Sequence, residues 1–198
     1  MEKKFKKYKK FILATSEDSD YKKDILAMND DEFKDYVIAV HEAGHTVMAF
    51  LNRIRVECLS IIPNEERHSL GHTKRAGKIP EIENGYTTLK ECEKEFIILL
   101  AGEIAKEFIF GEKKWSTNVS PGSDMEKAVS FSGKVKYRHF GIDFSEDEWI
   151  ESMIKRATVM MKPYENAIKA IAKKLIQRKK ISGQTARKIF KEHPPVEE

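Results

Sequence analysis

The apolar positions along the chain predict a buried helix in its first third. Residues 37–51 (VIAVHEAGHTVMAFL) contain no proline, and apolar residues fall on nearly every side of a helix drawn through them. A helix that is hydrophobic all round is normally buried. Asn29 or Asp30 can cap such a helix, and Asp31 and Glu32 are favourable beside its N-terminus. We therefore expect a long central helix with its own cap.

After Asn52 the pattern changes and predicts a small β-sheet or hairpin. Residues 54–62 (IRVECLSII) are rich in β-branched residues, alternate in part and end at Pro63, which is typical of a strand. Residues 69–75 (SLGHTKR) predict a second strand that pairs with the first. Residues 76–88 (AGKIPEIENGYTT) contain two glycines and a proline, which indicates an irregular loop.

Helical periodicity returns in the middle of the chain. Apolar residues recur at helical spacing from Thr88 to Phe110, and Gly111 is positioned to end this helix. After a second loop, Ser123 and Glu126 form the pattern of a capping box that opens another helix. We expect Phe140-Gly141 to close it.

The last quarter is also helical in pattern. Residues 146–179 predict helix with a break at Pro163, and residues 182–190 predict a short final helix before a loose tail at 192–198. Together these elements predict a mainly α (α+β) fold. Its main domain spans residues 31–191, with a small sheet or hairpin and a helical C-terminal part that begins at residue 146.

Composition and charge describe an ordinary globular chain. It has 198 residues, of which 34% are charged and 40% hydrophobic, and this fits one soluble domain. The net charge of +4 is mixed along the chain and indicates no nucleic-acid partner. Cys58 and Cys92 form no CxxC pair, which favours free thiols in a reducing compartment. No apolar run approaches the roughly 20 residues that span a bilayer, and the first residues contain no apolar h-region, so we expect no signal peptide. We therefore expect a cytoplasmic protein without a transmembrane segment.

The start of the chain is strongly basic. Residues 1–10 (MEKKFKKYKK) contain six lysines, and we interpret them as a solvated or frayed start to a basic N-terminal segment, residues 1–30. The alternative is a weak electrostatic tether to a membrane surface or an acidic partner. Residues 11–30 predict a short helix and its connections.

The central helix carries the candidate chemistry. Burying His41, Glu42 and His45 without partners would cost several kcal/mol, and a metal ion is the simplest compensation. His41 and His45 lie one turn apart on one helix face, so both can bind one zinc ion, and Glu42 can reach a water on that ion. The alternative is a core helix whose histidines hydrogen-bond internally, but the apolar surroundings favour the metal. Gly44 indicates close approach of another backbone.

A catalytic zinc site needs a third protein ligand, and spacing alone does not choose it. His72 on the second strand, Glu103 and Glu107 on the long helix, and Asp124 at the start of the next helix are all candidates. Each also has a role without metal: strand histidines are often exposed, helix glutamates are usually solvated, and a first-turn aspartate stabilises the helix dipole.

Six segments of the chain resemble one known family in order and spacing. They are AVHEAGHTVMAFL (39–51), SIIP (60–63), LGHT (70–73), LLAGEIAKEFIFGE (99–112), SDMEKA (123–128) and the run from Trp149 to Phe190. The family is that of the FtsH-type, membrane-anchored AAA zinc proteases, and the resemblance to their peptidase domain spans roughly residues 33–191. It implies a zincin-like helical metallopeptidase domain that holds Zn²⁺.

The resemblance also implies residue roles. In that family the third ligand is an aspartate that opens the helix after the FGE loop, and this position is Asp124. Leu70, Gly71, His72 and Thr73 match a strand presumed to lie beside the substrate, with histidine in place of the family's usual tyrosine. The family's usual Gly-Arg and Ala-Glu-Glu are here Gly102-Glu103 and Ala105-Lys106-Glu107. Glu103 and Glu107 are candidates for support around the metal ligands. The loop before Asp124 also departs from the family pattern.

The predicted function is a zinc-dependent endopeptidase acting on unfolded or flexible polypeptides. Zinc lowers the pKa of its bound water to about 7, and Glu42 serves as the general base. An extended substrate would add beside residues 69–75. The chain has no ATPase module, and Gly71 to Gly77-Lys78 lacks the spacing of a P-loop.

We therefore expect a free-standing peptidase domain that works without ATP, or with an ATPase or unfoldase partner in trans, and as a monomer or a homo-oligomer. Two alternatives stay open. One is a non-catalytic or regulatory module that binds a protein partner, and the other is a zinc hydrolase of a non-peptide acyl group.

Overall fold

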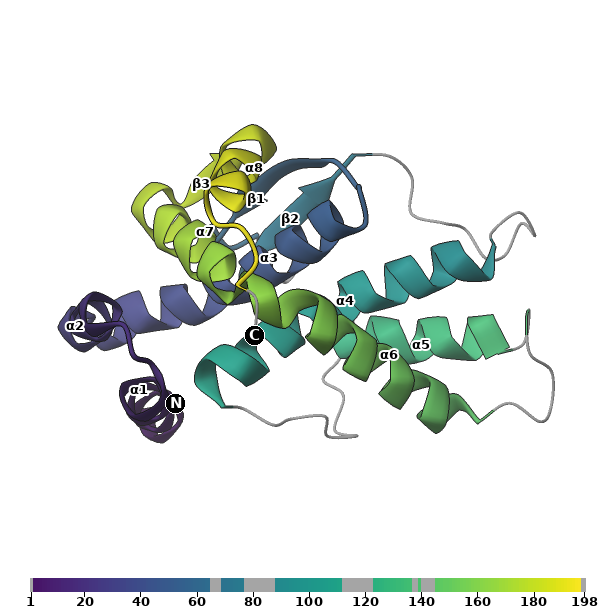
Figure 1. Ribbon diagram of the computed structural model, residues 1–198, viewed down its shortest axis with the longest axis horizontal. Coiled ribbons are helices and arrows are strands. Elements are labelled where there is room, and N and C mark those ends of the chain that lie inside the picture. Colours follow the sequence, from purple (N-terminus) through teal and green to yellow (C-terminus); the bar gives the residue numbers. More distant parts are fainter. Residues whose placement is uncertain are drawn as a thin grey trace.

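The computed structural model describes residues 2–64, 69–76, 88–111, 123–136, 139 and 145–196 (Figure 1). The elements in chain order are α1 (Glu2–Thr15), α2 (Ser19–Ala27), α3 (Asp30–Leu51), β1 (Val56–Ser60), β2 (His72–Arg75), α4 (Leu89–Phe110), α5 (Asp124–Val135), α6 (Glu146–Met161), the 3₁₀ turn η3 (Lys162–Tyr164), α7 (Glu165–Arg178), β3 (Lys180–Ser182) and α8 (Gly183–Glu192). The fold is mainly helical with a small sheet, as predicted.

The predicted central helix is α3, and the core forms where α4 and α7 pack against it. Asn29 caps α3 by accepting from the Glu32 backbone N–H, while the Glu32 side chain accepts from the Asn29 N–H. At Gly44 a Cβ atom would lie 2.5 Å from the Ala101 carbonyl oxygen of α4. The expected close approach at Gly44 is therefore confirmed, and it brings α4 against the middle of α3.

The predicted hairpin strands form part of a three-stranded antiparallel sheet in the order β2-β1-β3. Ser60 of β1 pairs with His72 of β2, and the register shifts between Val56 and Cys58. The third strand, β3, was not predicted, and it pairs with the other side of β1. As a result, β2 is an edge strand of this sheet.

Most predicted helix boundaries are confirmed. Thr88 caps α4 and Gly111 ends it in a left-handed conformation with φ of 67°. The Ser123 side chain accepts from the Glu126 N–H at the start of α5. The predicted closure of α5 at Phe140-Gly141 lies outside the described residues, and so do residues 77–87 of the loop predicted over residues 76–88.

The C-terminal part follows its predicted pattern. The break at Pro163 is the 3₁₀ turn η3 between α6 and α7, because proline cannot continue the hydrogen bonding of a helix interior. Ser182 caps α8 by accepting from the Thr185 N–H. None of the described helices is long and apolar enough to cross a membrane.

The N-terminal segment differs from the prediction. Residues 2–15 form α1, in which Tyr8 is 2% exposed and Ile12 is 1% exposed, and Tyr8 stacks on Phe110 of α4 at 5.0 Å between ring centroids. The interpretation as a solvated or frayed segment is therefore wrong for the described part. The prediction rested on the many lysines of this segment. In the structure, Lys3, Lys6 and neighbouring lysines face solvent, whereas the apolar residues of α1 form a stripe that faces the core.

Candidate metal centre

Three predicted ligand residues converge at one point between α3 and α5. The Nε2 atoms of His41 and His45 lie 3.0 Å apart, and the Oδ2 atom of Asp124 lies 3.0 Å from the first and 3.1 Å from the second. His41 and His45 come from successive turns of α3, and Asp124 is the first residue of α5. In the part of the chain that the structure describes, this is the cluster of side chains suited to a metal ion.

The remaining polar atoms of these side chains already have partners. His45 donates from Nδ1 to the Ile98 carbonyl oxygen at 2.7 Å, and His41 Nδ1 lies 3.4 Å from Glu103 Oε1. Lys127 donates from Nζ to Asp124 Oδ1 at 2.8 Å. A neutral imidazole has one N–H, so a proton on each Nδ1 leaves each Nε2 as an acceptor. Three acceptor atoms about 3 Å apart repel one another unless a cation lies among them.

The spacing of these three atoms suits zinc. A triangle with sides of about 3 Å has its centre about 1.7 Å from each corner, whereas zinc binds nitrogen and oxygen at about 2.0–2.2 Å. His41 and His45 would hold such an ion through their Nε2 atoms and Asp124 through Oδ2, and the ion would supply the positive charge that these acceptor atoms need. Metal-bound histidines usually donate their other ring N–H to a carbonyl or carboxylate, which matches Ile98 and Glu103.

The ionisation of the site also favours positive charge among these atoms. Burial lowers the pKa of His41, but hydrogen bonds with Asp124 and Glu103 outweigh burial and raise it to about 9. Burial raises the pKa of Asp124, but the two histidines outweigh this effect and hold it well below its usual range. For Glu103 the pKa falls to about 2, because His41 and Lys106 outweigh the effect of burial. Without metal, the raised pKa of His41 means that its ring carries a second proton, and this positive charge lies where a metal ion would place its own.

Glu42, the predicted base, is 5% exposed and is held by the edge strand. Thr73 of β2 donates from Oγ1 to Glu42 Oε2 at 2.8 Å and also lies 3.0 Å from the Glu42 carbonyl oxygen. A Cβ atom at Gly71 would lie 2.9 Å from Glu42 Oε1, so the glycine leaves room beside this oxygen. Sequence reasoning placed Thr73 beside the substrate and missed this hydrogen bond, for which the sequence carries no local signal.

The ring of His41 packs directly on α4. A Cβ atom at Gly102 would lie 2.4 Å from one carbon of that ring and within 2.7 Å of both ring nitrogens. Only glycine at this position leaves the ring its space, and sequence reasoning did not single out Gly102 for this role.

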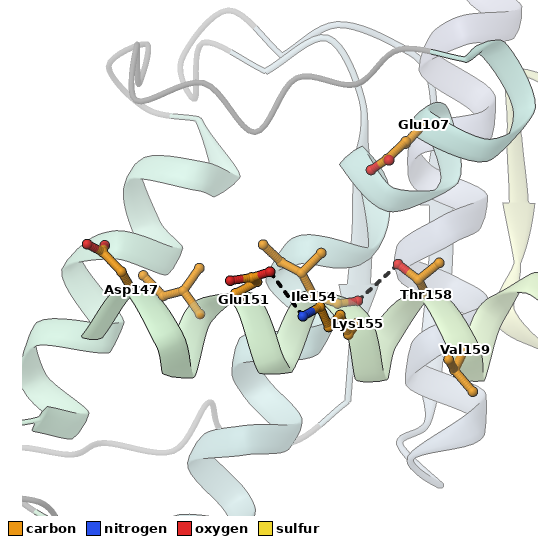
Figure 2. Close-up of a pocket in the computed structure, with 8 residues that line it drawn as sticks. Glu107, Asp147, Glu151, Ile154, Lys155, Thr158 and Val159 are labelled. Carbon is orange, nitrogen blue, oxygen red and sulfur yellow. Dashed lines mark hydrogen bonds and ion pairs between the residues drawn. The ribbon is translucent and has the colours of Figure 1, made fainter. Parts of the chain in front are cut away.

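The other predicted site residues are spread over two elements. Leu70, just before β2, is 56% exposed, and His72 is half-buried in the edge strand. Glu107 lies one turn beyond Glu103 on α4, and it lines a groove of about 680 Å³ beside α6 together with Ile154 (Figure 2). The structure thus places Glu103 against a predicted ligand and Glu107 at a different surface.

Comparison with known proteins gives a consistent set of relatives. The model of the family described as peptidase family M41 matches residues 27–141. The ATP-dependent zinc metalloprotease FtsH of Pirellula staleyi is 34% identical over 121 residues, which cover 56% of this chain and 16% of the relative.

Two further relatives match most of the chain. The ATP-dependent zinc metalloprotease YME1 homolog of Caenorhabditis elegans is 23% identical over 191 residues, covering 81% of this chain and 26% of the relative. The ATP-dependent zinc metalloprotease FtsH 1 of Thermoanaerobacter sp. is 25% identical over 193 residues, covering 78% of this chain and 30% of the relative. The chain spans less than a third of the length of each of these relatives.

Proposed function

Because the chain belongs to peptidase family M41, we propose that it is a zinc-dependent endopeptidase that hydrolyses unfolded or flexible polypeptides. Membership of this family and similarity to zinc metalloproteases imply a Zn²⁺ cofactor. The ion's ligands in this proposal are His41, His45 and Asp124. The observation that supports the assignment is the convergence of two imidazole Nε2 atoms and one carboxylate oxygen, each about 3 Å from the others.

When bound, zinc polarises a carbonyl oxygen and makes a water molecule acidic enough to attack at neutral pH. Glu42 is the general base. Its Oε2 accepts the Thr73 hydroxyl hydrogen bond, so Oε1 is the oxygen that takes the proton of the attacking water and returns it to the leaving amine. The absence of a side chain at Gly71 leaves space beside Oε1 for these molecules.

The edge strand β2 is the surface proposed for the substrate. Of the described strands, only β1 pairs with β2, so an extended peptide can add to the other side of β2 through main-chain hydrogen bonds. Such pairing demands an extended polypeptide and little particular sequence. Unfolded and flexible proteins are therefore the substrate class, and folded proteins would need an unfolding partner.

The test is casein cleavage by the purified chain together with its zinc content. We expect about one zinc ion per chain, cleavage that a chelator abolishes, and recovery when zinc is added back. Glu42→Gln should keep its zinc and lose cleavage by at least about 10²-fold, because it removes the base and leaves the proposed ligands. A His45→Ala variant should lose the metal.

Three outcomes would count against parts of this proposal. Wild-type protein that binds zinc but does not cleave casein would favour a non-catalytic module. If Glu42→Gln kept most of the rate, the base would lie elsewhere. Equal zinc in His45→Ala and wild type would remove His45 from the ligands.

A further inference from the structure

The buried ion pair between Arg75 and Glu95 links the edge strand to the helix behind the metal centre. Arg75 ends β2, and its two terminal nitrogens donate to the two carboxylate oxygens of Glu95 on α4, both at 2.7 Å. The exposed fractions of the two side chains are 17% and 4%. We propose that this pair positions β2 so that the Thr73 hydroxyl reaches the Glu42 carboxylate. The pair plays no part in the chemistry described above.

Strand geometry places Thr73 and Arg75 on one face of β2. Side chains alternate between the two faces of a strand, so residues two apart point the same way. Thr73 is opposite Leu59 and Arg75 is opposite Val56, and both of these β1 partners are buried. Lys74 points to the other face, where it pairs with Glu57 in solvent. Fixing Arg75 therefore also fixes the direction of Thr73.

The backbone alone leaves the position of β2 weakly determined. The strand has four residues, and its register with β1 shifts between Val56 and Cys58, next to the partner of Arg75. A slip of one residue would turn Thr73 to the opposite face and remove its hydrogen bond to Glu42. The two parallel hydrogen bonds of an arginine with a carboxylate have a defined geometry, which can specify one register.

Glu95 connects this register to the rest of the centre. It lies one turn before Ile98 on α4, and the Ile98 carbonyl oxygen accepts from His45 Nδ1. Helix α4 therefore orients the proposed ligand His45 directly, through the Ile98 carbonyl oxygen. It orients the proposed base Glu42 indirectly, because Glu95 holds Arg75 and the strand of Arg75 carries Thr73. Arg75 and Glu95 are positioning residues in this arrangement, since neither touches the proposed metal ligands.

Energetics separate positioning from stabilisation. A buried ion pair loses so much hydration that apolar residues of similar size often replace it without loss of stability, whereas removing one partner is strongly destabilising. The informative variant is therefore Arg75→Met with Glu95→Met, which removes both charges together. Glu57→Gln is the matched control, because it removes an ion pair made by the same strand on its exposed face.

The experiment measures four properties of the whole chain: melting temperature, zinc content, hydrogen exchange of residues 69–76, and the kcat and KM for casein. We expect the double variant to keep its melting temperature and zinc. The amides of β2 should exchange about tenfold faster, and kcat should fall between about tenfold and 100-fold with a smaller change in KM. Glu57→Gln should match wild type in every measurement.

Unchanged exchange in the double variant would overturn the proposal, and so would an unchanged kcat. A double variant that melts far below wild type would show that the pair holds the fold rather than a register, which also overturns it. The kcat measurement rests on the proposed peptidase function, whereas hydrogen exchange does not. If wild type proves inactive, the proposed function fails, and exchange in the double variant still decides whether the pair anchors β2.

Discussion

The residues of the candidate metal centre differ in which of their atoms are already occupied. Each proposed ligand has one polar atom with a partner outside the centre: His45 Nδ1 contacts the Ile98 carbonyl oxygen, His41 Nδ1 contacts Glu103, and Asp124 Oδ1 contacts Lys127. The other polar atoms, the two Nε2 atoms and Oδ2, face one another. A substitution that preserves shape but changes one of these atoms therefore tests one role at a time. Asp124, Glu103 and Glu107 form such a series, since all three were candidate ligands and the structure places them differently.

We expect zinc affinity to fall in a graded way across three amide substitutions. Asp124→Asn removes a negatively charged proposed ligand and should lower affinity by more than about 100-fold. Glu103→Gln removes a partner of a ligand and should lower affinity by about 10–100-fold. Glu107→Gln, at the groove beside α6, should leave affinity unchanged. Competition with a chromophoric chelator measures all three, and loss of zinc in Glu107→Gln would contradict the assignment of Asp124.

Sequence reasoning could reach part of this centre for a physical reason. His41, Glu42 and His45 lie within two turns of one helix, so their relation follows from helical spacing. Asp124 lies 83 residues from His41, and spacing alone leaves it as one of four candidates, among which the family resemblance favours it. The contact of Glu103 with His41 depends on how closely α3 and α4 pack, which no local pattern encodes.

At the scale of elements, local signals predicted boundaries well and long-range pairing poorly. The caps at Asn29 and Ser123, the stop at Gly111 and the break at Pro163 all act within a few residues, and all are confirmed. Strand β3 has three residues between two helices, and its conformation depends on pairing with β1 far earlier in the chain. Pairing between distant segments leaves little trace in a three-residue sequence.

Two helical glycines provide a prediction at this scale. Gly102→Ala should displace the His41 ring, lower zinc affinity at least about tenfold, and lower the free energy of unfolding by about 1–3 kcal/mol, because the new methyl has no space. Gly133→Ala is the matched control in α5, where a Cβ atom meets nothing within 4 Å. Because alanine favours helix more than glycine does, the free energy of unfolding of this variant should be about 0.4–1 kcal/mol higher than that of wild type.

Urea unfolding with zinc removed, and chelator competition with zinc present, measure the two effects separately. Normal zinc affinity in Gly102→Ala would mean that His41 does not need its position on α4. Reduced stability in Gly133→Ala would show that α5 is more tightly packed than its open surroundings indicate.

Over the whole molecule, both ends of the chain complete the structure around α3. Tyr8 and Ile12 of α1 belong to the core. At the other end of the chain, β3 forms the edge of the sheet opposite β2 (Figure 1). The proposed site therefore depends on packing contributed by the full described chain. The high lysine content of α1 predicts a solvated segment when it is averaged over all its residues. The apolar residues of α1 nevertheless repeat along one face of the helix, and Tyr8 and Ile12 on that face are buried.

By itself, this chain should act only on polypeptides that are already unfolded. A peptide must be extended to pair with β2, and unfolding a typical domain costs about 5–15 kcal/mol. The 198 residues contain no P-loop motif with which to couple ATP hydrolysis to that work. We therefore expect zinc-dependent cleavage of casein at the same rate with and without ATP, and no cleavage of a stable globular domain that carries an unstructured tag.

Both substrates should be measured with zinc-loaded wild type, with Glu42→Gln as the control for contaminating proteases. Adding urea at a concentration that unfolds the tagged domain but not the peptidase should convert it into a substrate, since the barrier lies in the substrate's fold. Degradation of the folded domain by this chain alone would reveal an unfolding route outside the proposed mechanism. A domain that stays intact even when unfolded, while casein is cleaved, would instead mean that recognition depends on more than an extended backbone beside β2.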